Sequence, residues 1–214
     1  CKENNFTKIE EVEYPNSLGI LYTTVTEFLG FKPNSDEWRV MALSSFCQNK
    51  KNKFYSILKN NVIKVDKKGG FEIDYSFFNG YFPLKPNLYS KKFLEFFGKP
   101  RKKKDPITIK HKLIAQAFQK VLEEVIFLKI DYLSKKFKEK NFCFSGGIFM
   151  NCLMNGKIEQ KFKKLNFYIP FAPDDSGNSI GAALFLKKNI LKHRVKVLNL
   201  NNAFLGPKYL NNEI

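Results

Sequence analysis

Residues 141–148 read Asn-Phe-Cys-Phe-Ser-Gly-Gly-Ile, a short apolar strand that runs into a glycine turn and then a helix. We expect this strand to be buried and the helix after it to span 148–165, where apolar residues recur at helical spacing. A second short strand is predicted at 167–169, before a helix at 179–189. A long amphipathic helix is predicted at 109–138. This order favours an α/β layer with at least partly parallel strands.

The paired glycines Gly146 and Gly147 make the first turn a candidate phosphate site. Glycine has no Cβ, so its backbone can approach a ligand closely. A helix N-terminus presents free N–H groups and partial positive charge to an anion, so phosphate or ribose-phosphate is the natural occupant. The alternative is a tight strand–helix turn without a ligand, because a lone Gly-Gly pair is a weak motif.

A second turn, at 173–183, reads Pro-Asp-Asp-Ser-Gly-Asn-Ser-Ile-Gly-Ala-Ala and also opens a helix. A carboxylate beside a phosphate would repel it, unless a metal ion lies between the two. Alternatively, Asp174 or Asp175 simply caps the helix. Two turns that each open a helix favour one shared nucleotide cleft.

The N-terminal half of the chain predicts mostly helices and loops. The expected elements are a helix at 17–30 bounded by Ser17 and Gly30, a helix at 36–46, a hairpin at 61–78, and a loop at 79–107 with a helical turn near 91–97. The phenylalanines near 77–78 and 93–97 are expected in the core. His111 is expected in a helix cap or on the surface.

The formal net charge of +17 would suit a polyanionic partner. The densest basic run, Arg101–Lys104, lies between Pro100 and Pro106 and reads as a loop. No aromatic–basic stacking motif accompanies it, so we expect no nucleic-acid partner. An anionic small substrate explains a basic cleft equally well.

The four cysteines contain no Cys-x-x-Cys pair, which argues against a zinc site. We expect reduced cytoplasmic thiols, with Cys152 packed in the core. No window approaches the roughly 18 uncharged apolar residues of a spanning helix, so we expect no membrane partner.

Residues 145–157 read Ser-Gly-Gly-Ile-Phe-Met-Asn-Cys-Leu-Met-Asn-Gly-Lys. This stretch resembles the Gly-Gly-Val-Ala-x-Asn-Cys-x-x-Asn-Gly-(Lys/Arg) stretch of NodU-type O-carbamoyltransferases. Further stretches resemble the same family in the same order: 15–22, 29–32, 37–43, 97–101, 111–119, 175–183 and 205–207. Each match is weak by itself, whereas the ordered series is specific and covers nearly the whole chain.

The resemblance implies a lobe of an actin-like ATPase (ribonuclease H-like) fold, a mixed sheet flanked by helices, related to tRNA threonylcarbamoyl-transfer proteins. It also implies ATP-dependent transfer of a carbamoyl group from carbamoyl phosphate, through a carbamoyl-adenylate, to a hydroxyl-bearing acceptor. We interpret residues 1–214 as the C-terminal lobe of the nucleotide-binding domain, without the upstream half that carries a metal-binding His-x-x-x-His motif. The downstream adenylate-forming domain is also missing, so we expect the chain to be inactive alone and to need these domains as partners.

Residue roles follow from the resemblance where the motif matches. The implied nucleotide contacts are Gly146, Gly147, Gly177 and Asn151, with Glu37 and Arg39 on the ribose or base side. Asp175 is implied as a ligand of an iron-like divalent metal whose histidine ligands lie outside this chain. Asn16 replaces the family's usual His, Trp38 its Tyr and Arg39 its Lys, which puts the acceptor contacts in doubt.

Two other interpretations stay open. One is a basic RNA-associated module related to the tRNA threonylcarbamoyl-transfer proteins, which a steep salt dependence of RNA binding would reveal. The other is a sugar-kinase or chaperone-like lobe of the same fold. The Asn-Cys-x-x-Asn-Gly continuation after the glycines argues against the sugar-kinase or chaperone-like interpretation.

Overall fold

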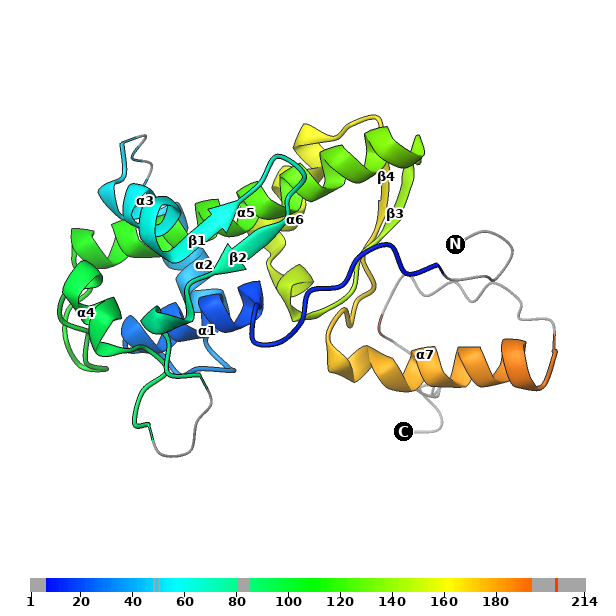
Figure 1. Cartoon of the computed structure of the whole chain (residues 1–214). Helices are drawn as coiled ribbons and strands as arrows, with labels where there is room; N and C mark the ends of the chain where they lie inside the picture. The colour runs from blue at the N-terminus through cyan, green and yellow to red at the C-terminus, as the bar shows by residue number, and fades with distance from the viewer. Residues whose placement is uncertain (1–6, 48, 50, 81–84, 194–202, 204–214) are drawn as a thin grey trace, which may run out of the picture. The chain divides into compact units, whose positions relative to one another are not determined.

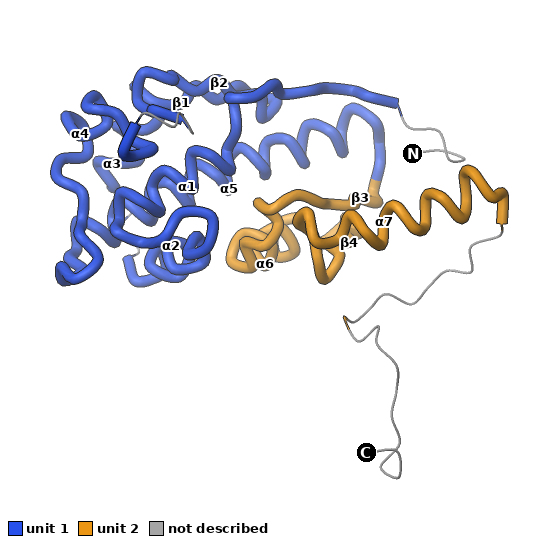
Figure 2. The backbone as a smooth tube through the Cα atoms, turned by 90° about the horizontal axis from the view of Figure 1, so that it is seen from below, with its two compact units in different colours: residues 1–139 blue, residues 140–214 orange. Residues whose placement is uncertain are grey.

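The computed structural model describes residues 7–47, 49, 51–80, 85–193 and 203. The chain divides into two compact units, residues 1–139 and 140–214, which Figure 2 shows in blue and orange. The predicted match at 205–207 lies outside the described residues.

Unit 1 is mainly helical (Figure 1). Its elements are α1 (Leu18–Phe28), α2 (Glu37–Ser45), α3 (Lys53–Ile57), β1 (Ile63–Val65), β2 (Phe71–Ile73), α4 (Lys91–Phe97) and α5 (Ile109–Phe137). The predicted helices at the positions of α1, α2, α4 and α5 are confirmed. Helix α3 was not predicted from the sequence.

Local capping explains where the two best-predicted helices begin. The Ser17 hydroxyl accepts a hydrogen bond from the Ile20 backbone N–H at the start of α1. At the start of α5, the Thr108 backbone N–H donates to His111 Nδ1, 3.0 Å away, as part of a capping box. His111 is therefore a capping residue, as expected.

Helix α1 ends against the basic loop of the same unit. Gly30 has a φ of +73°, and a Cβ added there would collide with the carbonyl oxygen of Arg101. Arg101 is itself buried, with its Nε 2.6 Å from the Leu29 carbonyl oxygen. The predicted loop at 101–104 is confirmed, and its first residue is buried because backbone carbonyls surround that guanidinium.

Aromatic rings form much of the core of unit 1. Phe93 and Phe97 stack with ring centres 4.3 Å apart, and Phe28 lies 5.1 Å from Phe93. Phe118 on α5 contacts both Phe93 and Phe97. All four side chains are almost completely buried, which confirms the predicted core role of the 93–97 cluster.

The predicted hairpin is present but shorter than expected. Strands β1 and β2 pair antiparallel, with Ile63 opposite Ile73. The Asp66 carboxylate accepts backbone N–H hydrogen bonds from Lys68 and Gly70 and so closes the turn. Residues Tyr75–Phe77 form a 3-10 turn rather than strand, because Asp74 caps them.

Unit 2 contains the two predicted parallel strands. Strands β3 (Asn141–Cys143) and β4 (Asn166–Tyr168) pair in parallel, in the register Asn141–Asn166 to Cys143–Tyr168. Helix α6 (Cys152–Lys161) connects them, and α7 (Asn178–Phe185) follows, continued by the π-helical turn Leu186–Ile190. The α/β character and the parallel pairing are confirmed.

Three expectations about these elements are wrong. The described strands form two separate two-stranded sheets rather than one mixed sheet, because each pairs only within its own unit and is three residues long. Strand β3 is not buried, since Asn141 and Cys143 are exposed. Cys152 is also exposed, because it is the first residue of α6 rather than part of the helix's buried side. None of the described helices is both long and apolar enough to cross a membrane.

Candidate phosphate-binding site

The two predicted turns meet at the carboxyl ends of β3 and β4. The Ser145 hydroxyl donates a hydrogen bond to the Pro173 carbonyl oxygen, 2.9 Å away. The Gly146 backbone N–H donates to the same oxygen. Ahead of them, the Phe144 N–H donates to the Tyr168 carbonyl and extends the strand pairing. One carbonyl of the second turn thus holds two consecutive residues of the first.

The two glycines of the first turn differ in whether the backbone conformation requires a glycine. Gly146 has φ +105°, a conformation that residues with a Cβ rarely adopt. The φ of Gly147 lies outside that range. A Cβ on either residue would meet nothing within 4 Å. The backbone conformation therefore requires Gly146, whereas nothing described in the chain requires a glycine at 147.

The element after the glycines differs from the predicted helix. Residues Gly147–Met150 form a 3-10 turn, and α6 begins only after Asn151. The Asn151 side-chain oxygen accepts the Met154 backbone N–H at 2.9 Å, which caps α6 and separates it from the glycine turn. The prediction of an unbroken helix from 148 is therefore wrong. The nucleotide contact of Asn151 stays a prediction.

Aromatic side chains support this turn, and the sequence reasoning missed their role. The Phe144 and Phe149 rings stack almost in parallel with centres 4.6 Å apart. Phe167 on β4 also stacks with Phe144, with ring centres 5.6 Å apart. In the sequence, the alternation of Phe142 and Phe144 is the pattern that could have predicted this supporting role. These rings hold the two sides of the Ser145–Gly147 turn at a fixed separation.

The second turn is ordered by its own short contacts. Asp174 accepts a hydrogen bond from the Ser176 hydroxyl, and its carbonyl accepts the Gly177 N–H at 3.1 Å. A Cβ at Gly177 would collide with the carbonyl oxygen of Ala172, so this glycine has a structural reason as well as a predicted binding role. Neither aspartate caps α7 with its side chain, because the residue that precedes α7 is Gly177.

Asp175 is exposed at the start of this turn and is free to face a ligand from the solvent side. Among the described residues, no group of three His, Cys, Asp or Glu side chains could hold a metal ion. A metal at Asp175 would therefore need further ligands from other parts of a polypeptide. The described residues thus offer Asp175 as one carboxylate beside this turn but do not by themselves complete a metal site.

Glu37 and Arg39 lie on α2 in unit 1 and already have local partners. The Glu37 carboxylate accepts the Asn34 N–H at 2.7 Å, and Arg39 Nε lies 3.3 Å from Asp36. The Arg39 guanidinium also lies 5.0 Å from the ring of Trp38, a side chain that is 57% exposed. Their predicted ribose or base contacts stay predictions.

The comparison with protein families gives a direct assignment. Residues 1–184 match the family described as Carbamoyltransferase N-terminus. The chain belongs to this family. The match includes both turns of the candidate site and ends inside α7, so the joined turns are part of the carbamoyltransferase N-terminal region.

Individual relatives agree with this assignment. An uncharacterized protein of Synechocystis is 31% identical over 99% of this chain and 34% of its own length. An uncharacterized protein of Methanocaldococcus jannaschii is 31% identical over 96% of the chain and 36% of its own length. Nodulation protein NolNO of Sinorhizobium fredii is 27% identical over 90% of the chain and 26% of its own length. The chain thus spans about a third or less of the curated relatives it matches.

Proposed function

We propose that this chain supplies the nucleotide-phosphate side of an ATP-dependent O-carbamoyltransferase site. In the proposed reaction, a carbamoyl group passes from carbamoyl phosphate, through a carbamoyl-adenylate, to a hydroxyl of a small-molecule or sugar acceptor. Membership of the carbamoyltransferase N-terminal family supports the transfer chemistry. The observation that carries the placement is the Pro173 carbonyl, which joins Ser145 and Gly146 beside an open glycine turn.

The geometry of the turn suits a phosphate. Open space lies beside Gly146 and Gly147, so phosphate oxygens could approach the backbone without a side chain in the way. Backbone N–H groups in such a turn can form an anion-binding concavity. The Gly146 N–H is not one of these donors, because it already donates to the Pro173 carbonyl oxygen. The net charge of +17 favours the approach of a polyphosphate through long-range attraction.

The remaining predicted residues keep their predicted roles in the proposal. Asn151 and Gly177, in the same unit as the turn, border the nucleotide, and Glu37 and Arg39, on α2 of the other unit, are proposed for the ribose or base without a placement relative to the turn. Asp175 contributes one oxygen to an iron-like divalent cation whose histidine ligands come from elsewhere in the polypeptide. Such a cation would neutralise phosphate charge next to the carboxylate.

The decisive experiment replaces Gly147 with Val and measures ATP binding by equilibrium dialysis. Because the site has room for a side chain and no left-handed backbone, the variant should fold like the wild type. ATP affinity should fall more than about tenfold, since the side chain would occupy the space of the phosphate. Gly156→Ala is the matched control, because it adds a Cβ into open space on α6. A folded Gly147→Val variant with wild-type affinity would refute this placement.

A second measurement separates the proposal from the RNA-associated alternative. Tight RNA binding with a steep salt dependence, together with no effect of ATP or carbamoyl phosphate, would favour the RNA module. In a polypeptide with carbamoyl-transfer activity, Asp175→Ala should remove most metal-dependent transfer and reduce bound metal. Retention of both would exclude the ligand role of Asp175.

A further inference from the structure

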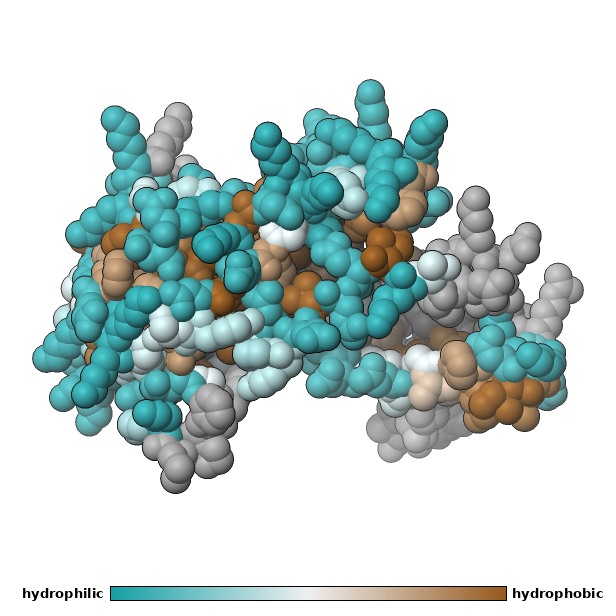
Figure 3. All heavy atoms as spheres, in the orientation of Figure 1, coloured by the Kyte–Doolittle hydropathy of each residue, from teal (hydrophilic) through white to brown (hydrophobic). Residues whose placement is uncertain are grey.

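Helix α7 is mostly apolar, yet neither it nor the turn after it, Leu186–Ile190, contains a buried residue. Residues 180–186 read Ile-Gly-Ala-Ala-Leu-Phe-Leu, and no residue of α7 is buried. Phe185 is 56% exposed, and Ile190 and Leu191 are exposed by more than half. Figure 3 shows brown, hydrophobic atoms gathered on this helix. A helix that is hydrophobic on all sides is normally buried, so α7 has the composition of a covered element.

Gly181 is a second feature of α7 that is typical of a helix covered by another segment. A glycine inside a helix costs about 0.5–1 kcal/mol relative to alanine. A Cβ at Gly181 would meet nothing within 4 Å, so no described contact in this chain offsets that cost. With Ala182 and Ala183 beside it, the glycine leaves room for another backbone to approach α7 closely.

The sheet of the same unit is also incomplete on its own. A two-stranded sheet is marginally stable at best, and parallel sheets are normally covered on both faces. Strands β3 and β4 have three residues each, and no other described strand pairs with either of them. Cys143 is exposed and Tyr168 is 45% exposed on one face of this sheet. The unit therefore offers unpaired strand edges as well as an uncovered helix.

The length of the relatives indicates what covers these surfaces. About two thirds of the Synechocystis relative lies outside its aligned region, and the family match of this chain ends at residue 184, inside α7. A second copy of the chain fits less well in a parallel arrangement, because α7 is followed by the exposed cations Lys187, Lys188 and Lys192, which parallel pairing of identical helices would bring together.

We propose that α7 and the open β3–β4 sheet form the docking surface for the part of a carbamoyltransferase polypeptide outside this aligned third. The occupant presents an apolar segment to Ile180–Leu186, adds a strand to an edge of the sheet, and carries carboxylates opposite the lysines after α7. This inference rests on family membership and the exposure of α7, and does not depend on ATP binding at the glycine turn.

The test compares the chain alone with a chimera in which it replaces the aligned third of the Synechocystis relative. Ala182→Glu should lower the Tm of the chimera and raise amide hydrogen exchange in α7 at least tenfold there. The same substitution should leave the Tm of the chain alone unchanged, because Ala182 is exposed in it. Asn189→Glu is the matched control, since it places the same charge at a half-exposed polar position, and it should change neither protein.

Three outcomes would overturn the proposal. Ala182→Glu could be harmless in both proteins, or it could destabilise the monomeric chain alone, or it could abolish a concentration-dependent dimer of that chain.

If the chimera does not fold, the remaining two thirds of the Synechocystis relative is added to the separate chain instead. Protection of α7 amides then supports the proposal, and unchanged exchange refutes it. The ATP affinity of the chain should stay unaltered in these experiments. The docking proposal and the phosphate-site proposal can therefore fail independently of each other.

Discussion

The Ser145 hydroxyl and the Pro173 carbonyl oxygen lie 2.9 Å apart and connect two turns that are 28 residues apart in sequence. The hydrogen bond lies beside the Gly146 N–H, which donates to the same oxygen. Two donors on one acceptor fix the first turn relative to the second in both position and direction. Each prediction about the candidate phosphate site starts from this contact.

Ser145→Ala should loosen the connection between the turns without unfolding the chain. One neutral hydrogen bond contributes about 0.5–1.5 kcal/mol, and the Gly146 N–H would remain bound to Pro173. We expect faster amide exchange at 145–147 and a small loss of ATP affinity. Ser134→Ala is the control, because that hydroxyl also donates to a backbone carbonyl, Asp131, but on α5. Equal effects of the two variants on exchange at 145–147 would contradict this role of Ser145.

Gly177→Ala and Gly181→Ala should act in opposite directions on the stability of the separate chain. The first places a Cβ against the Ala172 carbonyl oxygen and should destabilise unit 2 by about 1–3 kcal/mol through overpacking. The second places a Cβ in open space inside α7 and should stabilise that helix by about 0.5–1 kcal/mol. Urea unfolding of both variants, followed by circular dichroism, measures the difference. A stabilising Gly177→Ala would show that the turn has another conformation.

Arg101→Lys should destabilise unit 1 by about 2 kcal/mol, although the charge is kept. The Arg101 guanidinium donates to the carbonyls of Leu29 and Asp105 at 2.6 and 2.7 Å, and a lysine cannot reproduce this planar pattern. Lys103→Ala is the control and should stay within about 0.5 kcal/mol of the wild type, because Lys103 is exposed. Similar unfolding midpoints in urea for the two variants would argue against the structural role of Arg101.

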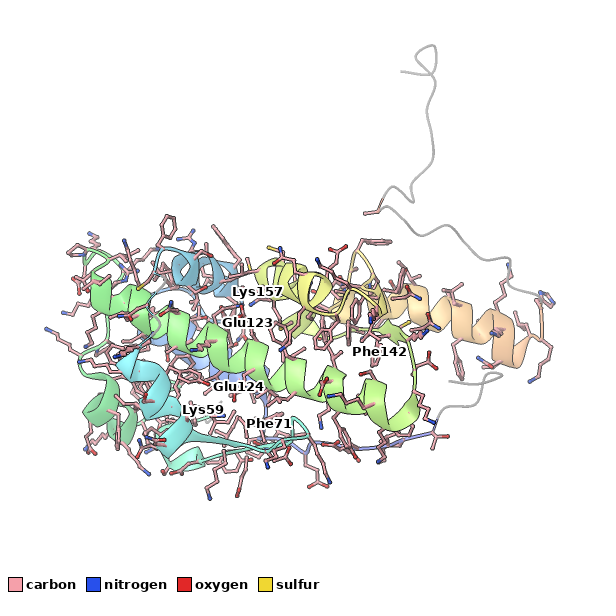
Figure 4. All side chains as sticks on the ribbon, turned by 90° about the horizontal axis from the view of Figure 1, so that it is seen from above. Lys59, Phe71, Glu123, Glu124, Phe142 and Lys157 are labelled. Carbon is pink, nitrogen blue, oxygen red and sulfur yellow. The ribbon has the colours of Figure 1, made fainter. Side chains whose placement is uncertain are left out.

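Tyr55 should make the stability of unit 1 fall at high pH. Burial, followed by the hydrogen bond to Glu124 and its negative charge, raises the pKa of Tyr55 from 10.0 to about 12. Glu124 also pairs with Lys59 at 2.8 Å, and Figure 4 shows the two labelled side chains close together. Between these pH values the folded state keeps the phenolic proton and the unfolded state loses it. This contribution is therefore complete below pH 10 and is lost as the pH rises to about 12.

Tyr55→Phe removes the titrating group and should flatten this part of the stability profile. The measurement is the free energy of unfolding of wild type and variant between pH 10 and 12, with phenolate absorbance as an independent record. Parallel profiles for the two proteins would rule out the contribution of Tyr55. Because lysines titrate in the same range, only the difference between the two proteins is informative.

The helices were predicted well where local signals define them. Ser17 was predicted as an N-cap and His111 as a cap-region or surface residue, and the structure has both in helix caps, His111 together with Thr108. Helix α3 was missed because its anchor is tertiary. The Asn52 side chain caps it by accepting the Phe54 N–H, and at the same time donates to the Leu113 carbonyl on α5. A stretch rich in lysine and asparagine gives no local sign of that contact.

The candidate site was predicted in outline but not in detail. Strand order and glycine placement indicated that the turns at 145–147 and 173–177 share one cleft, and their hydrogen bonds confirm that they lie together. The break at Asn151 could not be read from apolar periodicity, because the same residue fits a helix interior and an N-cap. The separation of the strands into two sheets depends on long-range pairing, which the order of elements along the chain does not determine.

The burial of Arg101 divides the basic run 101–104 into two kinds of charge. The Arg101 guanidinium donates hydrogen bonds to backbone carbonyl oxygens, whereas the side chains of Lys102, Lys103 and Lys104 are exposed. These three lysines are the charges of the run that a ligand or an acetylating reagent can contact directly, whereas the buried guanidinium of Arg101 adds its charge to the long-range field without being accessible. Neutralising the lysines would therefore slow association while leaving folding intact, whereas removing Arg101 would also cost the hydrogen bonds that hold this loop.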